Sequence, residues 1–400
     1  MLTMLGRNRP IRSEPSKQGP VRMAAVIAAL ALLLSGCTHQ PPSPEGSESP
    51  ASADDTADPT AAQSDGAADT GSEDGAPQLV AEDLNTPWSI AFFKGTPLVS
   101  ERDSGRILEL SEDRPAQSRE VATVESVVAE GEGGLLGLAV ADESLFAYFT
   151  SAEDNRIQRF PLSGEPGRLE LGEPETILDG IAKASFHNGG RLAIGPDGKL
   201  YATAGDAGNP ADAQDPESLN GSILRLNFDG TVPADNPDPD SPVYTYGHRN
   251  AQGLGWDAEG TMYASEFGQD TWDELNIIEA GRNYGWPEVE GIPASSGSTG
   301  SGSAGDFVAP VHQWSTEEAS PSGIAVTEDS IAIANLRGQR LRWVPLADTA
   351  RQETQFVGEY GRLRDVVSAP GGELWLMTNN TDGRGDPSDG DDRILSVRSR

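Results

Sequence analysis

"GPDGKLYATAGD" (residues 195–206) is followed by "SILRLNF" (residues 222–228), and this pair of segments recurs along the chain. In each copy, a turn built from Asp, Gly or Glu leads into an apolar run that ends in small polar residues, and a second apolar run follows. The other copies begin at Phe93, Ala141, Asp257, Thr327 and Ala369. A strand–loop–strand unit repeated at roughly 40 to 70 residues is typical of β-propeller blades. The copies predict an all-β fold of six four-stranded antiparallel blades, whose loops meet around a central axis.

Residues 1–37 have the pattern of a lipoprotein signal peptide. An apolar run, Ala24 to Leu34, is too short to span a bilayer and follows a basic leader. Leu34-Ser35-Gly36-Cys37 then resembles the site at which a cysteine receives lipid, and Cys37 is the only cysteine. We therefore expect an exported protein without disulfides, anchored by lipid on Cys37 to the outer face of the cell membrane. An ordinary secretory peptide with an incidental cysteine is the alternative.

Composition divides the rest of the chain into two parts. Residues 38–77 are rich in Ser, Ala, Pro, Gly and acidic residues, with no Lys, Arg or aromatic residue. Such a segment cannot bury enough apolar surface to fold, so it is predicted to be a disordered tether. Residues 78–400 suffice for one large all-β propeller domain, with a flexible surface loop over Glu290–Phe307. The net charge of −34 argues against a nucleic-acid partner.

Histidine is scarce, and one histidine stands where a propeller loop should enter the axis. His187 is one of four histidines and lies in "SFHNGG", just before an expected strand. An imidazole at such a position can accept a proton near neutral pH. A purely structural histidine is the open alternative.

Arginines recur at comparable positions of several blades. Arg249 and Asn250 follow His248 in "YGHRN", and Arg337 lies in "NLRGQR". Arg362 and Arg364 have the spacing that places two side chains on one face of a strand. Because Arg binds carboxylates bidentately, this set suits a polyanionic ligand. The equally open alternative pairs Arg362 and Arg364 with Glu359 and Asp365 in surface salt bridges.

A further segment, "SEFGQDTWDELNIIE", concentrates carboxylates: Glu266, Asp270, Asp273 and Glu274. Carboxylates together with irregular backbone carbonyls suit a hard cation such as Ca²⁺, although the spacing is not that of an EF-hand. The chain contains no HExxH, GxSxG, P-loop or CxxC motif, so hydrolysis by a serine or zinc mechanism has no support.

Taken together, these segments resemble the soluble pyrroloquinoline quinone (PQQ)-dependent glucose and aldose sugar dehydrogenases. The similarity extends from about Leu84 to Val397. Seven segments resemble family signatures in family order: "PWSIAF", "EGEGGLLGLAV", "HNGGRLAIGPDGKLYATAGDAGNP", "SLNGSILRLNFDG", "YGHRNAQGL", "DELNIIEAGRNYGWP" and "GRLRDVV". The resemblance implies a six-bladed propeller that binds PQQ and Ca²⁺.

The resemblance also implies roles for individual residues. His187 matches the general base, Arg249 and Asn250 match cofactor contacts, and Arg249 would polarise the quinone oxygen. Arg337 stands at a cationic position of the family. Arg362 and Arg364 match a pair that binds the PQQ carboxylates, and Glu132 matches a polar site residue.

For the metal, the resemblance implies two positions. Gly268 and Gln269 would offer backbone carbonyls to an active-site Ca²⁺, and Glu274 with the carbonyl of Tyr284 resembles a second calcium position. The family often has Gly-Pro where this chain has Gly268-Gln269. Phe186 and Ala207 also replace polar groups that contact sugar in some members, which implies a broad or non-glucose substrate.

The resulting hypothesis is a dehydrogenase that oxidises aldoses at the anomeric carbon to lactones by hydride transfer to PQQ. Its partners would be a small sugar and an external electron acceptor, since the chain has no CxxCH haem site. One alternative is a non-catalytic extracellular propeller that binds carbohydrate or protein. Another is a calcium-dependent lactone or ester hydrolase.

Overall fold

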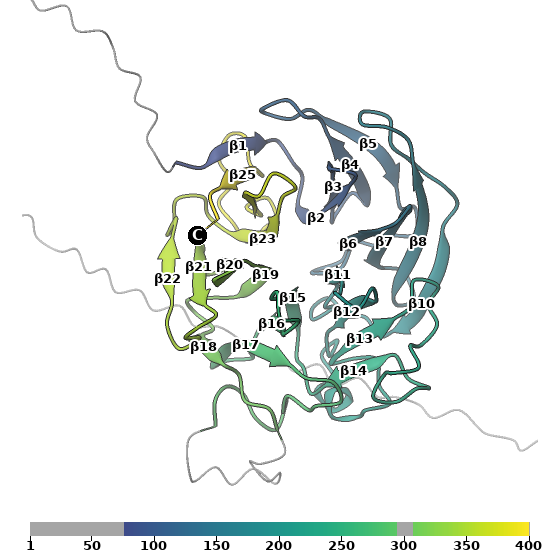
Figure 1. Ribbon diagram of the computed structural model, residues 1–400, viewed down its shortest axis with the longest axis vertical. Helices are drawn as coiled ribbons and strands as arrows, with labels where there is room; N and C mark the ends of the chain where they lie inside the picture. The colour runs from purple at the N-terminus through teal and green to yellow at the C-terminus, as the bar shows by residue number, and fades with distance from the viewer. Residues whose placement is uncertain (1–75, 294–306, 400) are drawn as a thin grey trace, which may run out of the picture. The chain divides into compact units, whose positions relative to one another are not determined.

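The computed structural model describes residues 76–293 and 307–399, and these residues form antiparallel sheets arranged around a central axis (Figure 1). From the innermost strand outward, the first blade is β2 (Pro87–Phe93), β3 (Thr96–Glu101), β4 (Arg106–Leu110) and β5 (Ser118–Thr123), and the second is β6 (Leu135–Ala141), β7 (Ser144–Thr150), β8 (Asn155–Ser163) and β10 (Glu175–Ile181). The third blade is β11 (Leu192–Ile194), β12 (Leu200–Ala204), β13 (Ser222–Leu226) and β14 (Val243–Tyr246), and the fourth is β15 (Ala251–Trp256), β16 (Met262–Glu266), β17 (Trp272–Ile278) and β18 (His312–Ser315). The fifth blade is β19 (Pro321–Val326), β20 (Ser330–Asn335), β21 (Arg340–Pro345) and β22 (Glu353–Gln355), and the sixth is β23 (Leu363–Ser368), β24 (Leu374–Thr378), β25 (Ile394–Val397) and β1 (Gln78–Ala81).

This arrangement confirms the predicted all-β, six-bladed propeller. Each repeat found in the sequence forms the second and third strands of one blade, as β12 and β13 do for the copy at residues 195–228. The second blade also carries a short strand, β9 (Glu170–Leu171), beside β8. Within the described residues the one helix is the 3-10 turn η1 (Pro210–Gln214).

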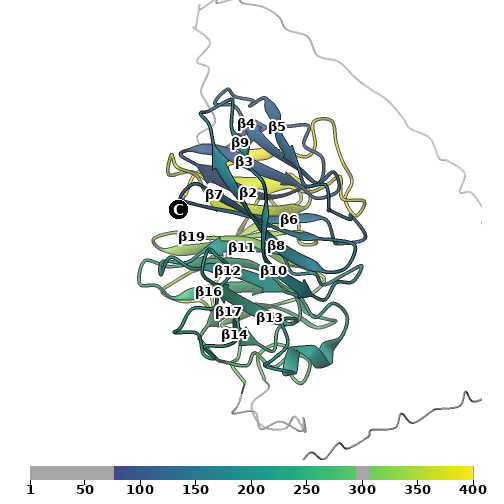
Figure 2. The same ribbon diagram turned by 90° about the vertical axis from the view of Figure 1, so that its right-hand side faces the viewer.

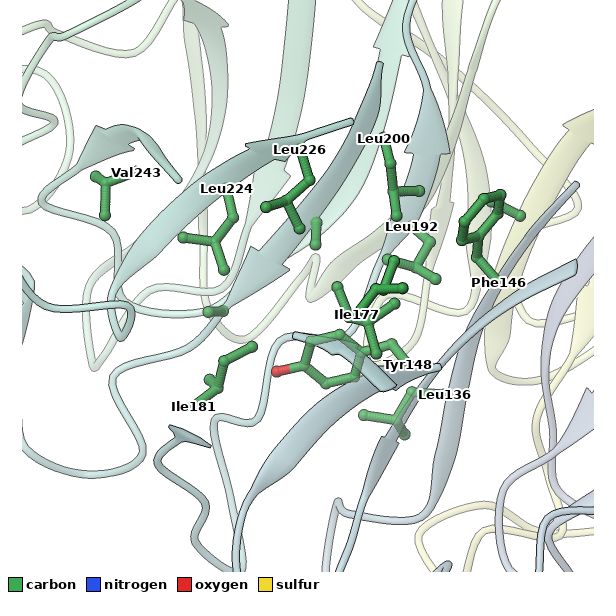
Figure 3. Close-up of a cluster of buried hydrophobic side chains, with 14 of the residues drawn as sticks. Leu136, Phe146, Tyr148, Ile177, Ile181, Leu192, Leu200, Leu224, Leu226 and Val243 are labelled. Atoms are coloured by element: carbon green, nitrogen blue, oxygen red, sulfur yellow. The ribbon is translucent and has the colours of Figure 1, made fainter. Parts of the chain in front are cut away.

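The blades pack against one another through apolar side chains. Figure 2 shows the blades from the side. Between the second and third blades, Phe146 and Tyr148 of β7 belong to one apolar cluster with Leu200 and Leu224, and all four side chains are fully buried (Figure 3). Burying a side chain of this size contributes about 1.5–3 kcal/mol. Clusters of the same kind lie between the other blades, so the fold holds the loops at the ends of the axis in place.

Both ends of the propeller contribute to its last blade. The N-terminal strand β1 pairs antiparallel with β25, with Leu79 opposite Leu395, and so forms the outer strand of the sheet that begins with β23 (Figure 1). The hydrogen bonds between β1 and β25 close the ring of blades. Ring closure therefore depends on a four-residue strand that is remote in sequence from its partner.

A charge placed on the inner face of β1 tests this closure. Val80 is 2% exposed, whereas Gln78 in the same strand is exposed. We expect Val80→Asp to lower the free energy of unfolding by roughly 2–4 kcal/mol, because a buried carboxylate without a partner is costly. Gln78→Asp is the matched control and should change stability little. Thermal unfolding compares the two, and equal midpoints would contradict a closing role for β1.

Several predicted features fall outside the described residues. Cys37, the signal peptide, nearly all of the predicted tether and most of the predicted loop over Glu290–Phe307 belong to this group. Across residues 76–293 and 307–399, no helix is long and apolar enough to cross a membrane.

Candidate active site

Loops and strand ends from all six blades meet around one small cavity on the axis. Its lining residues are Trp88, Glu132, Asn188, Gly189, Gln252, Phe267, Leu336, Arg364 and Arg384. Two of the predicted site residues, Glu132 and Arg364, are therefore brought together here. His187 directly precedes Asn188, and Arg337 directly follows Leu336. The structure thus assembles a site from segments that are far apart in sequence.

The imidazole of His187 is held by a carboxylate that is almost completely buried. His187 Nδ1 lies 2.7 Å from Oδ1 of Asp206, which is 1% exposed. A carboxylate accepts hydrogen bonds, so Nδ1 is the donor and Nε2 is left as the basic nitrogen. Among the described residues, no protein group bonds Nε2. Burial alone would raise the pKa of Asp206, but hydrogen bonds from His187 and from the Gly208 N–H lower it below its ordinary value.

The backbone around His187 is fixed from three sides. Its φ of 57° lies in the left-handed region, which is uncommon for a residue other than glycine. The His187 N–H donates to Glu132 Oε2 at 3.0 Å, and the Tyr148 hydroxyl donates to the Asn188 carbonyl at 2.9 Å. A Cβ on Gly205 would lie 2.0 Å from the His187 carbonyl oxygen, so only glycine fits there. These contacts hold the imidazole in one orientation.

Arg249 and Asn250 precede β15 and have different environments. Arg249 donates to the Phe267 carbonyl at 3.2 Å and to Gln269 Oε1 at 3.0 Å. Asn250 is buried, and its side-chain oxygen accepts the Gly189 N–H at 3.0 Å. Asn250 therefore ties the loop that carries His187 to the loop that carries Arg249. The other histidine of this motif, His248, is fully buried and bonds Glu266 Oε2 at 2.8 Å, as a structural histidine does.

The remaining predicted arginines differ in how their charge is balanced. Arg362 pairs with Asp382 Oδ2 at 3.0 Å, not with Glu359 or Asp365, because Asp365 is engaged by Arg191 at 3.0 Å. The surface salt bridges considered in the sequence alternative are therefore wrong for this pair. Arg337, an exposed side chain, donates to the Thr316 carbonyl at 3.1 Å.

Arg364 is buried without a carboxylate partner among the described residues. One Nη donates to Gln252 Oε1 at 3.1 Å and to the Ser322 hydroxyl at 3.3 Å, while its Nε has no partner within the described part of the chain. The guanidinium also lies 5.4 Å from the ring centroid of Trp88. Burial, and secondarily Arg362, lower the pKa of Arg364 to about 9. A buried cation with an unused donor is a favourable contact for an anionic ligand.

These arginines fit the tricarboxylic quinone that the sequence resemblance implies. Arg249, Arg337 and Arg364 each lack an ion-pair partner within residues 76–293 and 307–399. Arg364, a buried cation without a carboxylate partner, suits a carboxylate of PQQ, and Arg249, whose hydrogen bonds go to neutral partners, suits the quinone edge. The Nε of Arg364, without a partner in the described part of the chain, supplies a further donor at the cavity.

Three of the four residues predicted to bind metal lie around a second small cavity, which Arg249 also lines and Gln269 does not. Gly268, Glu274 and Tyr284 line it together with Glu266 and Glu290. Burial, and secondarily Glu266, raise the pKa of Glu274 to about 8. The Gln269 side chain points to Arg249 instead, through the bond at 3.0 Å. In the part of the chain that the structure describes, no group of three or more His, Cys, Asp or Glu side chains is arranged to hold a metal. A cation here would depend largely on backbone carbonyls, as the sequence resemblance implies for Gly268, Gln269 and Tyr284.

Sequence reasoning did not assign a role to several residues of the site. Asp206 orients the imidazole, Trp88 lies against Arg364, and Arg384 pairs with Glu132 at 2.9 Å across the cavity. Trp286 donates its indole N–H to Asp206 Oδ2 at 2.9 Å. Asp206 and Trp286 both lie within segments that resemble family signatures, which is the signal that could have drawn attention to them.

Comparisons with known proteins found a matching family model and similar proteins. The family model described as Glucose / Sorbosone dehydrogenase matches residues 84–386. The solved structure of the PQQ-bound aldose sugar dehydrogenase from Streptomyces coelicolor is 49% identical, with a TM-score of 0.74, and the match covers 81% of this chain and 98% of that one. An uncharacterised protein of Synechocystis is 32% identical over 76% of this chain and 84% of its own length.

A second curated relative matches over a shorter stretch. Quinoprotein glucose dehydrogenase B of Acinetobacter calcoaceticus is 32% identical over 56% of this chain and 55% of its own length. The family match covers most of the propeller and all of the residues that surround the cavity. The chain therefore belongs to the glucose/sorbosone dehydrogenase family, as its seven motifs predict, and it is an oxidoreductase of the PQQ-dependent sugar dehydrogenase type.

Proposed function

We propose that this protein oxidises aldose sugars at the anomeric carbon to the corresponding lactones, with PQQ and Ca²⁺ as cofactors. The observation that carries the proposal is the pairing of two features at the axis: an oriented imidazole, His187, which directly precedes a residue lining the cavity, and a buried cation in that lining, Arg364, which has no carboxylate partner in the described structure. A base beside an anion-binding site suits alcohol oxidation, in which a proton and a hydride leave the same carbon–hydroxyl group.

In this proposal His187 removes the proton. Nε2 accepts the proton of the anomeric hydroxyl, because Nδ1 is committed to Asp206. The electron pair of the O–H bond then forms the carbonyl of the lactone as the C1–H bond breaks. Asp206 stabilises the imidazolium that results, so the proton is held on His187 until solvent takes it.

In this proposal the arginines bind the carboxylates of PQQ and polarise its quinone. Arg364, Arg362 and Arg337 would hold the carboxylates of PQQ, with Arg249 and Asn250 toward its quinone edge. When bound, PQQ supplies the two-electron acceptor for the hydride that leaves C1. Arg249 donates to neutral partners at 3.0 and 3.2 Å, so its charge is available to stabilise negative charge that develops nearby. Glu132 fixes the His187 backbone and lies at the same cavity.

Calcium binding is part of the proposal. We expect the carbonyls of Gly268 and Gln269 to face an active-site Ca²⁺, and Glu274 with the Tyr284 carbonyl to hold a second one. Oxygen ligands of this kind suit Ca²⁺, which would act as a Lewis acid in the site. Gly268, Glu274 and Tyr284 line one cavity, which supports a cation position there; the second position rests on the sequence resemblance.

The direct test is reconstitution of the purified full chain. PQQ and Ca²⁺ are added to the apoprotein, and reduction of an artificial electron-accepting dye is followed with a panel of aldoses and simple alcohols. Turnover that requires PQQ and is lost on chelation of Ca²⁺ is the expected result. Tight PQQ binding without turnover on any substrate would refute the catalytic assignment and favour a binding role for the propeller.

Phe186 is expected to contribute to sugar binding. It is 44% exposed, although it is a large aromatic residue, and its ring packs edge-on against His187 with centroids 4.7 Å apart. An exposed aromatic face beside the base can pack on the C–H face of a sugar ring without selecting one pattern of hydroxyl groups. We expect Phe186→Ala to raise KM about 5- to 30-fold with a small change in kcat. Phe186→Leu should retain part of the affinity, and equal KM values for Phe186→Ala and the parent would exclude the contact.

Export, lipid attachment to Cys37, the disordered tether and transfer of electrons to an external acceptor complete the proposal. Their support comes from the N-terminal sequence and from the absence of a CxxCH motif in the chain. Mass spectrometry of the N-terminal peptide from membrane-extracted protein should find a lipid-modified cysteine. A peptide that begins elsewhere and carries no lipid would point to an ordinary secretory signal.

A further inference from the structure

Trp286 touches both halves of the proposed active site. The edge of its indole donates Nε1–H to Asp206 Oδ2 at 2.9 Å. The guanidinium carbon of Arg249 lies 5.5 Å from the centre of its ring. Asp206 orients the base, and Arg249 is the arginine assigned to the quinone edge. One side chain therefore lies between the group that orients the base and the cation that faces the cofactor.

The hydrogen bond from Trp286 fixes the orientation of the Asp206 carboxylate. Oδ1 is already shared by His187 Nδ1 at 2.7 Å and the Gly208 N–H at 2.8 Å. The indole binds the other oxygen, so the carboxylate cannot rotate without breaking bonds at both ends. Asp206 is 1% exposed, so water cannot readily replace a lost donor.

Trp286 is itself held by its backbone. Its N–H donates to the Gly247 carbonyl at 2.9 Å, and its carbonyl accepts from Gln214 Nε2 at 2.6 Å. Gly247 lies two residues before Arg249, and Gln214 ends η1. The indole is therefore anchored to the same loop that presents Arg249, which fixes the spacing between its two contacts.

We propose that Trp286 is a positioning residue that holds the His187–Asp206 pair through its N–H and Arg249 through its ring face. This inference rests on the proposed function for the roles of His187 and Arg249. It separates two contributions of one side chain: the N–H acts on the base, and the aromatic face acts on the cofactor-facing cation. The charged groups around this arrangement include Asp206, Arg249, Glu132, Glu266 and Glu290.

Two substitutions separate the contributions. Trp286→Phe keeps an aromatic face for Arg249 and removes the N–H, whereas Trp286→Leu removes both. Trp256→Phe is the matched control, because Trp256 lines a separate cavity whose other residues do not include Trp286, Asp206 or Arg249. Thermal unfolding checks that each variant is folded.

The first readout uses the apoprotein and does not depend on turnover. A hydrogen-bonded imidazole N–H beside a carboxylate gives a downfield proton resonance, and loss of that resonance in His187→Ala assigns it. We expect the resonance to shift and broaden in Trp286→Phe and in Trp286→Leu, and to be unchanged in Trp256→Phe. The dissociation constant of PQQ, from titration of the apoprotein, should stay within about twofold in Trp286→Phe and rise about 3- to 10-fold in Trp286→Leu.

The second readout is kcat of the reconstituted enzyme, expected to fall roughly 10-fold in both Trp286 variants because the base is less well oriented.

An unchanged resonance and an unchanged kcat in Trp286→Phe would overturn the role of the N–H. Equal loss of PQQ affinity in Trp286→Phe and Trp286→Leu would overturn the role of the ring face. If Trp286→Leu does not fold, Trp286→Phe alone decides the role of the N–H, and Trp286→Met replaces the leucine variant as a second side chain without an aromatic face. If no aldose is turned over by the parent protein, the proposed function fails, while the resonance and the PQQ titration still decide the inference.

Discussion

His187→Ala is expected to lower kcat by about 10²- to 10⁴-fold, the range that a positioned general base contributes. The physical reason is the orientation of the imidazole, which Asp206 Oδ1 holds from Nδ1 at 2.7 Å so that Nε2 is the basic nitrogen. Among the described residues, the hydrogen bonds of His187 go to Glu132 and Asp206 and not to the arginines assigned to the carboxylates of PQQ. Its loss should therefore leave the dissociation constant of PQQ within a few-fold of the parent value, measured by titration of the apoprotein.

His312→Ala is the control for this experiment. His312 lies in β18 and bonds the Thr349 carbonyl at 2.6 Å, away from the cavity. It should retain turnover. If His187→Ala kept most of its kcat, or lost PQQ affinity while kcat was preserved, the base would have to be sought elsewhere.

The sequence predicted the propeller because each blade repeats a local pattern. In "GPDGKLYATAGD", the turn at Asp197-Gly198 leads directly into β12, and the next apolar run is β13. These two strands are neighbours both in the chain and in the sheet, so periodicity and turn residues suffice to identify them. The pairing of β1 with β25 joins the two ends of the domain, and no repeated pattern predicts it.

The candidate site was assigned from family motifs. His187, Arg249 and Arg364 were chosen by resemblance; in the structure Arg364 lines the axial cavity, His187 directly precedes one of its lining residues, and Trp286 contacts both Arg249 and Asp206, the partner of His187. The partners of these residues were harder to find, because they come from other blades. Glu132 and Arg384 are separated by 252 positions, and Trp286 lies 80 positions from Asp206. The local sequence does not determine which loops of the propeller lie next to one another at the site.

The ion-pair partner of Arg362 was equally hard to predict from the sequence. The sequence offered Glu359 and Asp365 as partners because both are close in the chain. In the fold, Asp365 is 1% exposed and turned toward Arg191, while Asp382 of the following loop reaches Arg362. Alternation along β23 explains part of this result, since Arg364 and Asp365 must point to opposite faces of the strand.

Arg364→Met is expected to weaken PQQ binding roughly 10- to 150-fold, because a hydrogen bond to a charged group contributes about 1.5–3 kcal/mol. The side chain is 6% exposed and lies at the cavity beside Trp88, with its Nε unpartnered within the described residues. Methionine keeps much of the side-chain volume and removes the charge. Titration of the apoprotein with PQQ measures the effect, and kcat at saturating PQQ should change much less than in His187→Ala.

The same substitution is expected to leave the apoprotein as stable as the parent or more stable. Burial lowers the pKa of Arg364 to about 9, which means that the fold disfavours its charged form. For a base, a folded-state pKa below the unfolded value destabilises the protein at pH values below that pKa, so the cost is present at neutral pH. Removing the charge removes this cost, whereas Arg351→Ala, at an exposed position, should change neither stability nor PQQ affinity. A lower unfolding midpoint for Arg364→Met with unchanged PQQ affinity would show that the guanidinium serves packing and not cofactor binding, because a binding arginine loses affinity when its charge is removed.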